Sequence, residues 1–239
     1  MRNSYFKIIA ESLISGISDF AYPRICLISG LKIPESNSNP FILDEYIDYL
    51  ERANSDDLIS MREKTGIKLS FSAFAFRSEG YVQEIIHEMK YKGLKNIGIF
   101  LGEFINSELR KLGINLNDKF HICVPIPLHE AKRRERGYNQ SEYICKGITK
   151  GTEIEIIKNL LIRVKKTKTQ TKLSFEERKS NMKNAFIFNP VFVNKLNGIN
   201  AILVDDVITS GSTLKEAINV LKKSGIGEIF VITAAVARS

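Results

Sequence analysis

Two kinds of hydrophobic spacing alternate along most of the chain. Short apolar runs rich in β-branched and aromatic residues predict strands, and apolar residues at every third or fourth position predict helices. Strands are predicted at 69–76, 119–126, 160–164, 201–204 and 229–236, with helices between 80 and 93, at 94–112 and from 212 onward. This alternation predicts an α/β domain with a mainly parallel sheet flanked by helices.

The N-terminal part of the chain has a different pattern. Helical spacing predicts helices at 4–20 and 43–61, with an exposed polar loop at 34–40 between them. We therefore expect two regions. Residues 1–70 would form a small helical hood, and residues 71–239 would form the main domain.

Composition narrows the functional classes only modestly. The net charge of +8 suits a protein that handles polyanions, whether pyrophosphates or nucleic acid. The three cysteines are widely spaced and form no CxxC pair, which argues against a disulfide framework and favours a reducing cytoplasm. No run of 18 apolar residues and no signal-peptide pattern occurs, so we expect a cytoplasmic protein without membrane insertion.

One stretch between a predicted strand and a predicted helix carries most of the candidate chemistry. It reads ILVDDVITSGST over residues 202–213. Asp205 and Asp206 follow the apolar run at the carboxyl end of the strand, which is the edge where open α/β sheets bind ligands. The small residues after them lead into a helix, so their N–H groups and hydroxyls can bind a phosphate. These phosphate-binding candidates are Thr209, Ser210, Gly211, Ser212 and Thr213.

The two carboxylates require a different ligand group, because a phosphate would repel them. They suit the vicinal hydroxyls of a ribose, with a metal ion to offset the remaining charge. The pattern therefore predicts a sugar that carries a 5′-phosphate. In the alternative interpretation, Asp205 and Asp206 only end the strand and the hydroxyl-rich segment only caps the helix. Either half alone fits that alternative, whereas the two halves together favour a ligand site.

The same stretch resembles the phosphoribosyl pyrophosphate loop of type I phosphoribosyltransferases and fills every position of that signature. In that family two acids bind the ribose hydroxyls and the following loop holds the 5′-phosphate. The resemblance implies a type I phosphoribosyltransferase-like fold with Mg²⁺ as cofactor. It also implies that Asp205 and Asp206 are catalytic and hold the Mg²⁺ together with the ligand.

Further segments are similar to one branch of that family, the ComF/GntX-type proteins associated with DNA uptake in competent bacteria. They occur in the family's order and, with the loop, span about two-thirds of the chain. The segments are 91–93, 124–127, 136–140 and 170–178 with Asn181. This resemblance implies a link to competence, with single-stranded DNA or competence proteins as candidate partners.

The N-terminal region departs from the ComF pattern, which usually begins with a four-cysteine zinc module. Ser29 stands where the second cysteine is expected after Cys26, and no cysteine pair follows at 31–76. A tetrahedral Cys₄ site cannot be assembled from this segment. We therefore expect no zinc and a buried Cys26.

The resemblance also implies a pyrophosphate loop at Pro125, Ile126 and Pro127, which would act through backbone amides in a turn restricted by the prolines. The basic run 132–136 follows. The side chains of this run fit a solvated face, but Arg136 begins the matched segment 136–140 and is a candidate contact for pyrophosphate or nucleic acid.

Two other basic segments each have two possible interpretations. For the polar loop at 165–172 the resemblance implies a lid that closes over substrate, with an unstructured connector as the alternative. Lys90 and Lys92 fit cations at a helix C-terminus as well as contacts to phosphates. The candidate lid contacts are Lys166, Lys168 and Gln170.

Two functions from different classes fit these observations. The first is a ComF-like phosphoribosyltransferase homologue that binds phosphoribosyl pyrophosphate, or a ribose-5-phosphate-type ligand, and transfers or exchanges a phosphoribosyl group. The second is a non-catalytic competence accessory protein that keeps a phosphate-sugar pocket and associates with single-stranded DNA through basic residues near Tyr138 and Tyr143. A Rossmann domain fits less well, because no G-x-G-x-x-G follows a strand.

Overall fold

The computed structural model describes residues 24–164 and 184–238. The chain divides into two compact units, Met1–Leu50 and Glu51–Ser239. The helix predicted at 4–20 and the lid predicted at 165–172, with Lys166, Lys168 and Gln170, lie outside the described residues. None of the described helices is long and apolar enough to cross a membrane.

The described part of the first unit contains a tight turn and the 3₁₀ helix η1 (Asp44–Tyr49). The N–H of Gly30 donates to the carbonyl of Cys26 at 2.9 Å, and Gly30 has a φ of 70°, which glycine adopts without strain. Cys26 is buried, as expected, and its Sγ accepts the N–H of Leu43 at 3.4 Å. The turn therefore persists with Ser29 in place of a second cysteine.

The prediction of a single helix at 43–61 is wrong. After η1 the chain is extended, and backbone hydrogen bonds pair this segment antiparallel with β1 (Ser70–Phe76). Asn54 then begins α2 (Ser55–Thr65), because its side chain accepts the Asp57 N–H while the Asp57 carboxylate accepts the Asn54 N–H. Apolar spacing alone did not reveal this new helix start.

The second unit begins earlier than the region expected from sequence. It starts at Glu51 rather than at residue 71, because α2 packs against β1 and α8 (Ser212–Lys223). Arg238, near the C-terminal end of the chain, also forms hydrogen bonds with α2. Its guanidinium donates to both carboxylate oxygens of Asp57 and thereby fastens the last strand to this helix.

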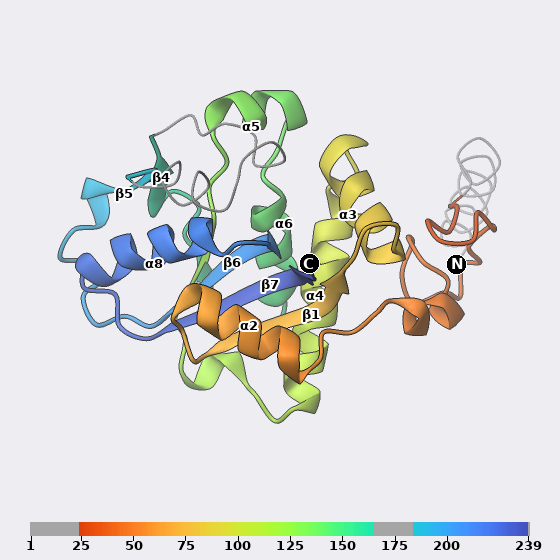
Figure 1. Cartoon of the computed structure of the whole chain (residues 1–239), viewed down its shortest axis with the longest axis horizontal. Coiled ribbons are helices and arrows are strands. Elements are labelled where there is room, and N and C mark those ends of the chain that lie inside the picture. Colours follow the sequence, from red (N-terminus) through yellow and green to blue (C-terminus); the bar gives the residue numbers. More distant parts are fainter. Residues whose placement is uncertain (1–23, 165–183, 239) are drawn as a thin grey trace, which may run out of the picture. The chain divides into compact units, whose positions relative to one another are not determined.

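A five-stranded sheet with the order β1-β7-β6-β2-β3 forms the centre of the second unit (Figure 1). All four neighbouring pairs are parallel, which confirms the predicted mainly parallel sheet. The remaining strands are β2 (Ile122–Pro125), β3 (Glu155–Ile156), β6 (Ala201–Ile208) and β7 (Ile229–Ala237). The predicted strand at 160–164 is β4 (Leu161–Arg163), which pairs antiparallel with β5 (Phe186–Phe188) in a separate small sheet.

Helices cover both faces of the large sheet (Figure 1). α2 and α8 cover one face and close the main apolar core, whereas α4 (Asn96–Lys111) and α6 (Gln140–Ile148) cover the other. The other described helices are α3 (Tyr81–Tyr91), α5 (Glu130–Arg136), and the 3₁₀ turns η2 (Leu116–Asp118) and η4 (Pro190–Phe192).

α4 and α6 meet backbone to backbone. A Cβ atom on Gly102 would lie 2.2 Å from the carbonyl oxygen of Ile144, and one on Gly147 would lie 2.1 Å from that of Ile99. Neither position has room for any side chain. This contact fixes α6 against α4, and α6 also packs on β2 and β6. The N-terminus of α6 is therefore held near the strand ends that carry the candidate site.

We predict that Gly102→Ala lowers the free energy of unfolding by about 1–3 kcal/mol, because the added methyl group must push two packed helices apart. Urea denaturation measures this change. Gly80→Ala is the matched control, since the nearest atom to its Cβ is 3.7 Å away. Equal effects of the two substitutions would contradict the close-packing argument.

Candidate functional site

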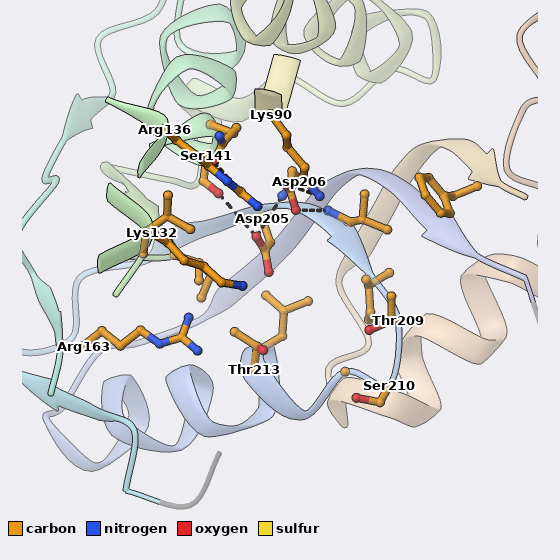
Figure 2. Close-up of a pocket in the computed structure, with 18 of the residues that line it drawn as sticks. Lys90, Lys132, Arg136, Ser141, Arg163, Asp205, Asp206, Thr209, Ser210 and Thr213 are labelled. Carbon is orange, nitrogen blue, oxygen red and sulfur yellow. Dashed lines mark hydrogen bonds and ion pairs between the residues drawn. The ribbon is translucent and has the colours of Figure 1, made fainter. Parts of the chain in front are cut away.

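A cavity of about 350 Å³ lies at the carboxyl ends of the central strands (Figure 2). Its walls come from α3, α5, α6, β4, β6 and the loop that leads into α8. The parallel topology explains this convergence, because the carboxyl ends of β2 and β6 lie side by side. Both predicted carboxylates and most of the predicted phosphate loop line this one cavity.

The two carboxylates are held by different helices. Asp206 Oδ2 lies 2.9 Å from Lys90 Nζ of α3, and both side chains are mostly buried. Asp205 Oδ1 accepts the hydroxyl of Ser141 in α6 at 3.3 Å and the N–H of Asp206 at 2.9 Å. The acidic pair lies within β6 rather than after it, since this strand continues four residues past the predicted end at Val204. The positions of both carboxylates are therefore fixed by strand and helix contacts.

The environment of Asp205 favours its protonated form. Burial and then the charge of Asp206 raise the pKa of Asp205 to about 7, although the Asp206 N–H, Lys90 and Arg163 act in the opposite direction. At neutral pH this carboxyl is therefore poised between its two forms. A cation or a hydroxyl donor placed against it would favour the ionised form.

The hydroxyl-rich loop lies at the N-terminus of α8, as predicted. Thr209, Ser210, Gly211 and Thr213 line the cavity, and the hydroxyls of Ser210 and Ser212 lie 2.9 Å apart. Gly211 has a φ of 73°, and a Cβ there would lie 2.7 Å from Cβ of Lys64 in α2. Glycine is required both by this backbone conformation and by the close packing on α2.

Cations line the side of the cavity opposite the hydroxyl-rich loop. Figure 2 shows Lys132, Arg136 and Arg163 on one side of the acidic pair, with Thr209 and Ser210 on the other. Burial, followed by the charges of Arg136, Arg163 and Lys90, lowers the pKa of Lys132. Such crowding of positive charge is favourable when an anion is bound between the cations.

The predicted pyrophosphate turn is placed only partly in the cavity. Ile126 lines it, and its carbonyl accepts the Asn139 side-chain amide at 2.9 Å. Pro125 and Pro127 are not among the lining residues, whereas the predicted Arg136 is. The turn is therefore fastened to the start of α6, next to the cations.

Sequence reasoning missed several residues of this cavity. Arg163 had a signal, because it stands near the end of a predicted strand, just before the basic loop, whereas Ser141 had none. Lys90 and Lys92 could not be distinguished from sequence. The structure places Lys90 in the cavity and Lys92 at the surface, 3.9 Å from Glu88.

Comparisons with known proteins agree with the resemblance seen in the sequence, although no protein-family model matches. The chain is 41% identical over 108 residues to Competence protein F of Haemophilus influenzae, covering 45% of this chain and 47% of that protein. It is 31% identical over 152 residues to the DNA utilization protein YhgH of Salmonella typhimurium, covering 62% and 63%. This chain is a homologue of those two proteins.

The matches span between about half and just under two-thirds of the relatives' own lengths. Among solved structures, an allosteric regulatory enzyme of purine biosynthesis aligns with 73% of this chain and 30% of its own, at a TM-score of 0.35 and 15% identity.

We predict that Asp205→Asn stabilises the magnesium-free protein more at pH 8 than at pH 4. The pKa of Asp205 is raised from its ordinary 3.8 to about 7, so ionisation of this group removes stability as the pH rises between these values. Asparagine cannot ionise, so the variant does not lose stability in this way. Thermal unfolding at the two pH values measures the difference.

Asp206→Asn is the control for that experiment. It leaves Lys90 without its ion-pair partner in a mostly buried position, so we expect a lower melting temperature at pH 8. If the difference in melting temperature between Asp205→Asn and the wild type is the same at both pH values, the raised pKa of Asp205 is contradicted.

Proposed function

We propose that this protein is a ComF-like phosphoribosyltransferase homologue whose cavity binds phosphoribosyl pyrophosphate with Mg²⁺. One observation carries the proposal: the acidic pair lies between a hydroxyl-rich loop and a group of cations (Figure 2). The loop suits a 5′-phosphate, the carboxylates suit the ribose hydroxyls, and the cations suit a diphosphate at C1. The order of these three parts matches the order of the groups along the ligand.

The charge of the cavity supports a polyanionic ligand. Four cations, Lys90, Lys132, Arg136 and Arg163, line it together with two carboxylates. The raised pKa of Asp205 reduces the negative charge further at neutral pH. A ligand with several phosphate groups therefore suits this cavity better than a neutral nucleoside.

The donor set fits Mg²⁺ if the ligand completes its coordination. Asp205 and Asp206 offer hard oxygen atoms, which Mg²⁺ prefers. Within residues 24–164 and 184–238, no group of three or more His, Cys, Asp or Glu side chains is placed to hold a metal ion. Ribose hydroxyls, diphosphate oxygens and water would therefore supply the other positions. Bound Mg²⁺ would neutralise charge on the diphosphate.

The proposed reaction needs no protein nucleophile. The bond between C1 and the diphosphate oxygen breaks, its electron pair leaves with the diphosphate, and an acceptor atom forms the new bond at C1. Asp205 and Asp206 would stabilise positive charge on the ribose. Lys132, Arg136 and Arg163 would stabilise negative charge on the leaving group, in positions that the fold fixes before binding.

We predict that the wild type binds phosphoribosyl pyrophosphate in a magnesium-dependent manner and that Asp205→Asn/Asp206→Asn abolishes this binding. The double variant loses the acceptors for the ribose hydroxyls and the metal. Isothermal titration calorimetry with and without Mg²⁺ measures both effects. Asp48→Asn/Asp56→Asn is the control, since it makes the same charge change at two exposed residues that are not among those lining the cavity. Unchanged affinity in a folded Asp205/Asp206 double variant would refute the proposed site.

A second candidate function, association with single-stranded DNA, has its own support. The ring of Tyr143 lies 4.1 Å from Nζ of Lys146 and 5.8 Å from that of Lys95. Tyr138 packs edge-on against Tyr143, with ring centroids 5.3 Å apart. Aromatic rings interleaved with cations suit stacked bases and a phosphate backbone. The names of the relatives refer to competence and DNA utilization, which supports a role connected with DNA. We propose that this role is DNA uptake in the cytoplasm, with competence proteins as partners.

We predict that Tyr143→Leu weakens binding of an oligodeoxythymidylate by about tenfold, because a stacking surface between two cations is lost. Fluorescence anisotropy at fixed salt concentration measures the affinity. Tyr49→Leu is the control, since Tyr49 is 65% exposed and stands in the first unit with Tyr46 as its aromatic neighbour. Equal affinities of the wild type and Tyr143→Leu for the oligonucleotide would contradict DNA binding at Tyr143.

A further inference from the structure

Gln140, at the start of α6, has a buried amide with an unused donor. The residue is 1% exposed and lines the cavity, and its Nε2 has no hydrogen-bond partner among the described residues. Its Oε1 accepts a hydrogen bond from Nη1 of Arg136 at 3.1 Å. Because a guanidinium only donates, this contact fixes the orientation of the amide and directs the NH₂ group elsewhere.

An unpaired donor inside a protein is unfavourable, and such groups normally have a partner. Here the donor belongs to a side chain of the cavity wall, where a ligand can supply the acceptor. The surrounding cations mean that this acceptor is an anionic oxygen rather than a neutral one. A phosphate oxygen that reaches this amide would therefore supply the missing acceptor.

The neighbours of Gln140 show which part of the ligand it would meet. Ser141 donates to Asp205, and Asn139 donates to the carbonyl of Ile126 in the predicted pyrophosphate turn. Figure 2 shows Ser141 and Arg136 on the opposite side of the acidic pair from Ser210. A sugar whose 5′-phosphate occupies the hydroxyl-rich loop therefore turns its C1 end toward Gln140.

We propose that Gln140 Nε2 donates a hydrogen bond to a diphosphate oxygen at C1 and that, with Arg136, it distinguishes the diphosphate-bearing sugar from ribose 5-phosphate. This inference rests on the proposed function, because it assigns one group of the same ligand. Arg136 supplies charge and holds the amide, whereas Gln140 supplies a directed donor. Ribose 5-phosphate lacks the diphosphate acceptor, so Gln140 and Arg136 do not increase its affinity.

The test compares phosphoribosyl pyrophosphate with ribose 5-phosphate, each titrated with Mg²⁺ into the wild type, Gln140→Glu and Gln140→Met. Gln140→Glu keeps an acceptor for Arg136 but replaces the NH₂ donor by a carboxylate oxygen and adds a negative charge, whereas Gln140→Met removes both the donor and the acceptor without changing the charge. We expect each variant to lose roughly 10- to 100-fold in affinity for phosphoribosyl pyrophosphate and to bind ribose 5-phosphate as the wild type does. Gln83→Met is the control, because Gln83 also accepts a hydrogen bond, from the Glu79 N–H at 2.7 Å, but lies outside the cavity.

Each other outcome overturns the proposal. Equal losses for both ligands would mean that Gln140 only positions its neighbours, and unchanged affinity for both would mean that the amide meets no ligand. If Gln140→Met does not fold, Gln140→Glu still tests whether position 140 faces the diphosphate, because it preserves an acceptor for Arg136 and places a repelling charge there. A wild type that fails to bind phosphoribosyl pyrophosphate would refute the proposed function itself, before any variant is compared.

Discussion

Two adjacent carboxylates, partly buried within the second half of a parallel strand, repel each other and lose solvation. Contacts from the surrounding structure offset much of this cost. Lys90 reaches Asp206 from α3, and Ser141 reaches Asp205 from α6. The offset is incomplete, because the pKa of Asp205 remains raised to about 7. A site that is electrostatically unfavourable when empty gains more from a bound cation or hydroxyl donor, which is the usual compromise between stability and function.

Backbone contacts give this site its rigid support. Gly102 and Gly147 let α4 and α6 touch, and Gly211 lets the phosphate-loop candidate rest directly on α2. Contacts of this kind leave little room for adjustment, since protein interiors are close-packed. The helix that carries Gln140 and Ser141 and the loop that carries the hydroxyls are therefore held at fixed places around the acidic pair. Preorganised donors of this kind lower the cost of binding a charged ligand.

The proposed sugar-phosphate site shares structural elements with the candidate DNA surface, which consists of Lys95, Tyr138, Tyr143 and Lys146. Arg136 lines the cavity and also lies 5.2 Å from the ring of Tyr91, whereas Tyr138 reaches back to the Met89 carbonyl of α3. The segment from α5 to α6 therefore contributes to both. Arg136 faces the cavity and Tyr138, two residues later, packs against Tyr143, so one short segment contributes to both proposed sites.

The sequence by itself determined the parallel α/β architecture and the acidic pair with its hydroxyl-rich loop, because these depend on local patterns of apolar and polar residues. It could not separate η1 from α2, since the capping box at Asn54 interrupts an otherwise helical spacing. Only the tertiary structure decided that Lys90 enters the cavity while Lys92 does not, and that Arg163 and Gln140 join it. Those placements depend on the crossing of α3 and α6 over the sheet and on a strand outside the main sheet. Contacts between residues so distant in the chain leave no periodic signal in the sequence, because they arise only when the elements pack.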